Sequence, residues 1–150
     1  MRLPASIRAR FRRHGREGGR RRARALTPEA RRAIARGAAL RRWIRARFGA
    51  AHFAELDLPG GDLVDRGLDD LCADRETPES LLVSLAAPRL RREGVPLPRA
   101  LQSDGDWRLY RALEAAHGDL AHARYLALLS RMTSFADSCR LARIEDVDRA

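Results

Sequence analysis

The chain has 150 residues, of which 45% are hydrophobic and only 5% aromatic, and its formal net charge is +10 at pH 7. A chain of this length can bury roughly 70% of the surface that its unfolded form exposes, so it can fold as one domain without disulfides or metals. A core built mainly of leucine and alanine is typical of packed helices. The longest apolar runs, such as residues 81–87, are much shorter than the ~20 residues that cross a bilayer, which argues against a membrane span.

The distribution of charge is more informative than its total. All thirty basic residues are arginine, a bias typical of a GC-rich, bacterial-like genome, so arginine content alone says little. Residues 1–48, however, hold 17 arginines against Glu17 and Glu29, a net charge of +15, whereas residues 49–150 hold 13 arginines against 18 acids, a net charge of −5. Codon bias acts on the whole chain and cannot separate the signs in this way.

The segment of residues 1–25 contains ten arginines, one acid and three glycines. Such a segment cannot bury enough apolar surface to offset the entropy lost on ordering, and its like charges repel one another. We expect a disordered arm that becomes ordered on a polyanion. A solvated tail or an arginine-rich leader peptide is the alternative, although the segment has a single serine and no clear amphipathic face.

The triplet Thr27-Pro28-Glu29 predicts the start of a helix, because it combines a capping hydroxyl, a proline at the first helical position and an acid at the positive end of the helix dipole. The helix is expected to reach Phe48 and to stop at Gly49. Its apolar side chains recur at steps of three and four and form a stripe, which consists of Ala30, Ala33, Ile34, Gly37, Leu40, Trp43, Ile44 and Phe48.

Two helices are expected in the middle of the chain. A turn at residues 59–61 precedes Asp62, which can cap the first, and a second Thr-Pro-Glu triplet at residues 77–79 opens the other, which should bend near Pro88 and end around Gly94. A short strand within residues 53–58 is an alternative for the segment before them. The inward side chains are expected to be Leu63, Val64, Leu68 and Leu71, followed by Leu81, Leu82, Leu85 and Leu90.

An extended connector at residues 95–98 leads to two further helices. Asp104 or Asp106 can cap a helix over residues 107–117, and the chain breaks at Gly118 before a last helix over about residues 120–142. The buried face of that helix is expected to hold Tyr125, Leu129, Met132, Ala136 and Cys139, flanked by Leu128 and Phe135.

The strongest candidate for a binding surface is the arm together with the arginine face of the first helix. Clustered guanidinium groups bind phosphates and stay charged at every physiological pH, and the release of counterions gives affinity without any sequence preference. The candidate nucleic-acid-binding residues are Arg8, Arg10, Arg12, Arg13, Arg16, Arg20, Arg21, Arg22, Arg24, Arg31, Arg32, Arg36, Arg42 and Arg45.

The acidic middle of the chain supports other functions less well. A helix-turn-helix around residues 73–76 would present Glu79, Ser80 and Ser84 to DNA, but residues 53–80 carry nine acids and two arginines, a net charge of −7 that phosphates would repel. Asp62, Asp65 and Asp69 share a helix face and could hold a divalent cation. We expect them instead to be solvated or to pair with arginines of the first helix.

No catalytic constellation is expected. The four histidines form no pair at helical spacing, no phosphate loop or nucleophile elbow is present, and the free thiols Cys72 and Cys139 occupy positions where a small buried residue would serve. Trp43, Trp107, Tyr110 and Tyr125 could stack on bases, but their spacing is more typical of core residues, and we assign none of them to a site.

These patterns predict an all-α protein, a small bundle or orthogonal array of about five helices over residues 26–150, with residues 1–25 as a disordered basic arm. We expect a cytoplasmic, non-enzymatic accessory protein that contacts nucleic acid or another polyanion and uses no cofactor, metal or membrane. The alternative is a protein-interaction module, an antitoxin-like or adaptor subunit, whose acidic middle meets a basic partner encoded nearby. An enzyme is the third candidate. No segment carries a motif specific enough to name a family.

Overall fold

The computed structural model of the protein describes the backbone of residues 4–148 and their side chains except those of residues 6, 22, 23 and 143–148. Within that range the chain is helical and has no strand, so the all-α prediction is confirmed and the segment before α3 is a 3-10 turn instead of a strand. The elements are α1 (Ala5–Ala25), α2 (Pro28–Phe48), η1 (Phe53–Leu56), α3 (Gly61–Cys72), α4 (Pro78–Arg92), α5 (Gly105–His117), η2 (Gly118–Leu120) and α6 (Ala121–Asp148).

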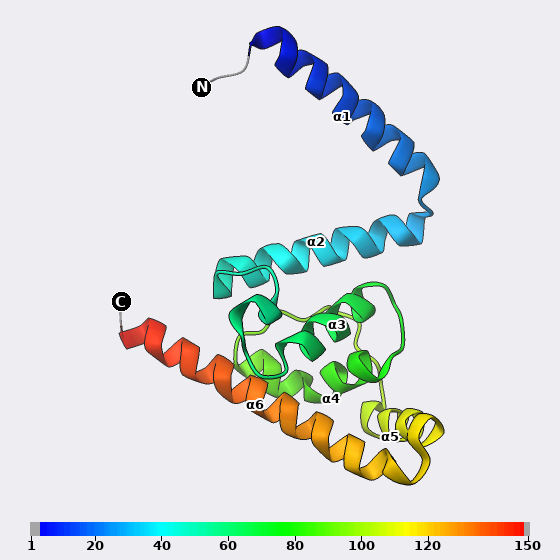
Figure 1. Cartoon of the computed structure of the whole chain (residues 1–150), viewed down its shortest axis with the longest axis vertical. Coiled ribbons are helices and arrows are strands. Elements are labelled where there is room, and N and C mark those ends of the chain that lie inside the picture. The colour runs from blue at the N-terminus through cyan, green and yellow to red at the C-terminus, as the bar shows by residue number, and fades with distance from the viewer. Residues whose placement is uncertain (1–3, 149–150) are drawn as a thin grey trace.

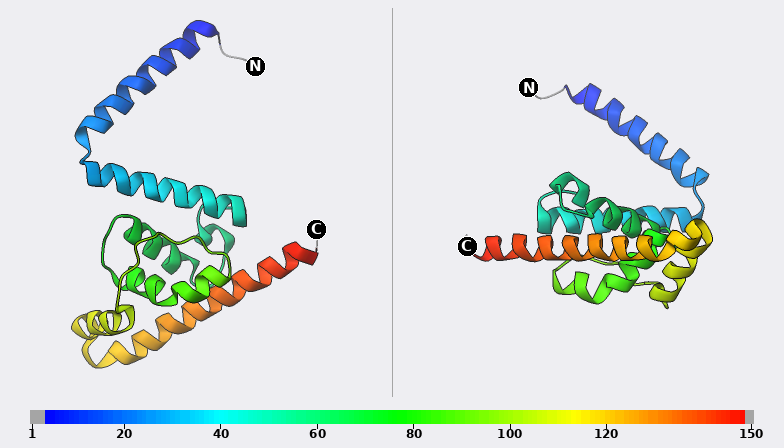
Figure 2. Two further views of the ribbon diagram at one scale, coloured as in Figure 1. Left: turned by 180° about the vertical axis from the view of Figure 1, so that it is seen from behind. Right: turned by 60° about the horizontal axis from the view of Figure 1, so that its bottom comes forward.

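Five of these helices, α2 to α6, form the bundle (Figure 1). Helix α2 packs on α3, α3 packs on α4, and α5 and α6 form a hairpin that also contacts α4. As a result α2 and α6 lie on opposite sides of the bundle, with α3 and α4 between them. Helix α1 stands clear of the bundle in every view (Figure 2).

The core lies between α2, α3, α4, α5 and α6, and three aromatic rings meet within it. Phe53 in η1 is fully buried, and its ring meets those of Phe48 and Phe135 edge to face, with ring centroids 5.1 Å and 5.0 Å away. The leucines expected to face inward from α3 are all buried, as are Leu81, Leu82 and Leu90 of α4 and Met132, Phe135, Ala136 and Cys139 of α6.

Both threonine caps form as expected. The Thr27 hydroxyl accepts a hydrogen bond from the Ala30 amide at 3.2 Å, and α2 ends at Gly49 in the left-handed conformation. In the second cap, the Thr77 hydroxyl accepts from the Ser80 amide at 3.1 Å while the Ser80 hydroxyl accepts from the Thr77 amide at 2.8 Å. Each reciprocal bond satisfies an amide that helix geometry leaves free. Helix α4 continues through Pro88 to Arg92.

The start of α5 differs from the expectation. Asp104 occupies the N-cap position but its side chain makes no capping bond, and Asp106 lies inside the first turn. The Asp106 carboxylate instead accepts a hydrogen bond from the Tyr125 hydroxyl of α6. This bond, with burial as a smaller cause, raises the pKa of Tyr125 to about 12. Asp106 therefore joins two helices and does not cap one.

Residues 5–25 form the helix α1, whereas a disordered arm was predicted for residues 1–25. Arginine and alanine, which dominate the segment, are both strong helix formers, and their contribution outweighs that of the three glycines. The predicted separation from the bundle is retained, since every described side chain of α1 is exposed to solvent. The order in this segment is therefore local and does not come from tertiary packing.

Candidate nucleic-acid interface

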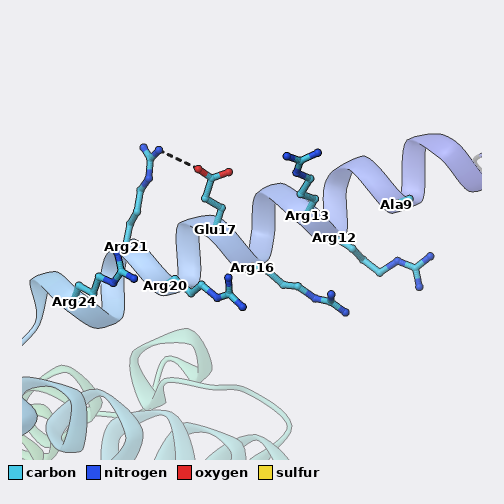
Figure 3. Close-up of a pocket in the computed structure, with 8 residues that line it drawn as sticks. All are labelled: Ala9, Arg12, Arg13, Arg16, Glu17, Arg20, Arg21 and Arg24. Atoms are coloured by element: carbon cyan, nitrogen blue, oxygen red, sulfur yellow. Dashed lines mark hydrogen bonds and ion pairs between the residues drawn. The ribbon is translucent and has the colours of Figure 1, made fainter.

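Helix α1 presents a row of guanidinium groups that winds gradually around the helix. Arg8, Arg12, Arg16, Arg20 and Arg24 follow one another at steps of four residues, which places successive members about 6 Å apart along the helix axis. In Figure 3, the side chains of Arg12, Arg16 and Arg20 extend from the same side of α1 into solvent. Like charges at this spacing repel one another, so an anion lying along the row would stabilise the helix.

The other side of α1 carries Arg10, Arg13 and Arg21, together with Glu17, the single acid of the helix. Glu17 accepts a hydrogen bond from Arg21 at 3.1 Å, one turn away (Figure 3). Among the described residues of α1 this is the only ion pair. The side chain of Arg22, also a predicted site residue, lies outside what the structure describes.

The predicted arginines of α2 divide into two groups. Arg31, Arg32, Arg42 and Arg45 are exposed and pair with no carboxylate among the described residues. Arg36 is different, because it donates to the Asp74 carboxylate and, at 2.8 Å, to the carbonyl of Cys72 at the end of α3. Arg36 therefore links α2 to α3, and its side chain is still 41% exposed to solvent.

Arg41 was not predicted as a site residue, and the structure gives it a structural role. Its side chain is only 14% exposed and donates to the carboxylates of Asp65 (2.5 Å) and Asp69 (2.7 Å) on α3. Burial alone would lower the pKa of Arg41, but the hydrogen bonds to these carboxylates outweigh it and leave the pKa raised. A signal was present in the sequence, since Arg41 lies seven residues after Ile34 and seven before Phe48, on the apolar stripe itself.

Asp65 completes this polar cluster. It is the one buried carboxylate among the described residues, and it also accepts a hydrogen bond from the amide of Ala54 in η1 at 2.9 Å. Asp62, two turns from Asp69, pairs with Arg66 and with Arg131 of α6. The acids on this face therefore pair with arginines, as expected, and within the described range no cluster of ligands is suited to a metal ion.

Most of the remaining negative charge in the middle of the chain is paired as well. Asp70 pairs with Arg75, Glu76 with Arg108, and Asp74 with Arg36 as described above. Because the arginines of the bundle neutralise these acids, little unpaired negative charge is left on α3 and α4. The unpaired positive charge is correspondingly concentrated on α1 and the outer side of α2.

The tryptophans were expected in the core, and the structure shows that this is wrong. Trp43 on α2 is 70% exposed and Trp107 on α5 is 67% exposed. The apolar stripe of α2 is wider than the surface that α3 covers, so only Leu40 and Ile44 are buried. Tyr110 and Tyr125 are partly buried and meet edge to face across α5 and α6.

The other chemical candidates lie in the interior. Cys72 and Cys139 are free thiols and both are buried, as expected. Burial raises the pKa of both thiols, that of Cys139 to about 12, so neither is poised as a nucleophile. Ser80 and Ser84 of the hypothetical recognition helix are hydrogen-bonded to Gln102, in the loop before α5, and Ser80 is fully buried.

No protein-family model matches this chain, and neither a curated protein nor a solved structure does. Over residues 4–148 no helix is both long enough and apolar enough to cross a membrane. The function is therefore inferred from the chain's own residues.

Proposed function

We propose that this protein is a non-enzymatic accessory protein that binds nucleic acid without sequence preference, through the arginines of α1 and of the outer side of α2. The observation that carries the proposal is the distribution of unpaired charge. Most arginines from α3 to α6 are paired with acids, whereas Arg31, Arg32, Arg42 and Arg45 of α2 are not. The described arginines of α1 are open to solvent and share one acid, Glu17.

The physical basis is the release of counterions from the phosphate backbone. Each phosphate that an arginine neutralises frees condensed cations, and this gives affinity without contacts to the bases. A row of guanidinium groups about 6 Å apart can meet several successive phosphates, and it needs no partner groove of defined shape. Binding through this surface should therefore depend steeply on salt and weakly on sequence.

A salt titration of duplex binding tests the proposal. The variant R12Q/R16Q/R20Q removes three charges from one side of α1, and glutamine keeps the helix propensity close to that of arginine. We expect the slope of log affinity against log salt to become shallower by about 2 to 3, since each lost phosphate contact removes about 0.9.

The matched control is R111Q/R124Q/R140Q, which removes the same charge from exposed positions on α5 and α6. We expect its slope to stay within about 0.5 of that of the unaltered chain, because these positions contact no phosphate. Equal slopes for the two triple variants would show that only net charge matters, and the proposed surface would be wrong.

The alternative function, a module whose acidic middle binds a basic protein, receives less support. Of the nine acids in residues 53–80, the structure pairs seven with arginines of the same chain. A basic partner would have to displace these arginines. Stoichiometric co-purification with a protein, resistant to nuclease and to high salt, would favour this function over nucleic-acid binding.

A further inference from the structure

The exposed indole of Trp43 is the feature of α2 that helix packing does not explain. The side chain is 70% open to solvent, whereas Leu40 and Ile44 of the same helix are buried against the bundle. Tryptophan is enriched at binding surfaces, where its large flat ring supplies much of the contact.

Three arginines share the helix face of Trp43. Arg32 lies eleven residues before it, Arg36 seven before and Arg47 four after, and these steps all return to the same side of an α-helix. All three arginine side chains are exposed to solvent. The indole is therefore placed within a line of guanidinium groups, which would hold an anionic ligand beside it.

The same tryptophan borders a groove between α2, the end of α3 and the connector over residues 95–100. The groove has a volume of about 850 Å³, and its lining is largely apolar, with Leu71, Pro96 and Pro98 among the lining residues. Arg36 and Arg99 also line it, and the one acid there, Asp74, is paired with Arg36. The groove thus combines flat apolar surface with a positive rim.

We propose that this groove binds single-stranded nucleic acid, with a base stacked on Trp43 and the adjoining phosphates paired with Arg47 and Arg99. This proposal rests on the proposed function and adds the class of ligand. Stacking platforms combined with a cationic groove are how proteins hold unpaired bases without reading sequence. Bases in a duplex are already stacked on one another and cannot reach the indole, so the groove discriminates in favour of single strands.

The test compares two tryptophan variants of the full chain. W43A should weaken binding of a 12-nucleotide oligothymidylate by roughly 5- to 150-fold, the effect of losing one stacked base. W107A is the matched control, because Trp107 is equally exposed but its ring is already covered by Arg111, 5.8 Å from the ring centroid, and that arginine is paired with Glu114. We expect W107A to change that affinity less than twofold, and W43F to retain most of it.

Two further probes separate stacking from charge. Binding of a duplex of the same length, and of inorganic polyphosphate, which has no bases, should change less than twofold in W43A. In a W107F background, which leaves Trp43 as the single tryptophan, oligothymidylate should quench the indole emission and polyphosphate should not.

Three results would overturn the inference: equal affinity of W43A and W107A for the oligothymidylate, an equal loss for all three probes, or indole emission unaffected by the oligothymidylate. A monomer in W43A where the unaltered chain is a dimer would assign the groove to a second copy instead.

If R12Q/R16Q/R20Q flattens the salt slope while W43A has no effect, only this inference fails. If no nucleic acid binds at all, the proposed function fails with it.

Discussion

Arg41 and Arg42 are adjacent in sequence, yet they face opposite environments. The guanidinium of Arg41 lies against two carboxylates of α3, and that of Arg42 is exposed with no acid among the described residues. Removing one member of a buried ion pair leaves the other charge without compensation in a medium where it is poorly solvated. The two positions should therefore respond very differently to the same substitution.

We expect R41A to lower the free energy of unfolding by roughly 3 kcal/mol, because Asp65 would stay buried without its cation. R42A should change it by less than about 0.5 kcal/mol, as substitutions at open surface positions usually do. Urea unfolding followed by circular dichroism measures both. Similar losses in the two variants would mean that the Arg41 cluster contributes nothing to stability.

Cys139 predicts how stability depends on alkaline pH. Its pKa is about 12 in the folded protein, against 9.0 for an ordinary thiol, because burial disfavours the thiolate. Above pH 9 the unfolded chain releases this proton while the folded chain keeps it, so the free energy of unfolding should fall as the pH rises from about 9 to 12.

Urea unfolding across that range tests this expectation. In C139A the fall should be smaller, because only the raised pKa values of Cys72 and Tyr125 then contribute. An identical pH profile for C139A and the unaltered chain would contradict the assignment to Cys139.

At the scale of elements, the packing of α3 on α4 depends on one glycine. A Cβ atom on Gly67 would lie 2.5 Å from the carbonyl oxygen of Glu79 and 2.6 Å from Cγ2 of Val83, so the two helices approach too closely for any larger residue. Gly37 of α2 is also helical, but nothing lies within 4 Å of its hypothetical Cβ.

The substitution of alanine should have opposite signs at these two glycines. G67A should lower the free energy of unfolding by about 1 to 3 kcal/mol, since the helices must separate. G37A should raise it by about 0.5 to 1 kcal/mol, because alanine loses less backbone entropy in a helix and meets no clash. Thermal unfolding of the two variants decides this, and a destabilised G37A would contradict the open surroundings of that residue.

The positions of the helices could be predicted because their signals are local. The threonine caps at residues 27 and 77 and the break at Gly118 act on neighbouring backbone groups, so the sequence alone contains the information. The capping role of Asp104 or Asp106 failed because a tertiary partner, Tyr125, competes for the Asp106 carboxylate. No local pattern identifies that partner.

The candidate site was predictable in its charge and not in its geometry. The excess of arginine before residue 48 is visible in the sequence, but which arginines are free depends on where α3 lies. That packing pairs Arg36 and Arg41 with acids and leaves Trp43 exposed. The width of the apolar stripe on α2 could not show which part a neighbouring helix would cover.

At the scale of the whole molecule, charge is divided between a neutralised bundle and an open cationic surface. Five arginines of α4 to α6 pair with acids of the bundle, for example Arg89 with Asp137 at 2.8 Å. The described side chains of α1 make no such ion pair with the bundle, and the helix projects from it (Figure 2). A polyanion approaching the protein would therefore meet its strongest attraction at α1.

The salt dependence of nucleic-acid binding by the intact chain and by a chain that begins at Thr27 tests this division most directly. We expect the shorter chain to bind duplex more weakly at low salt and to show a slope shallower by several units, at about 0.9 per lost phosphate contact. The same slope and affinity for both chains, or the absence of binding by either, would contradict it.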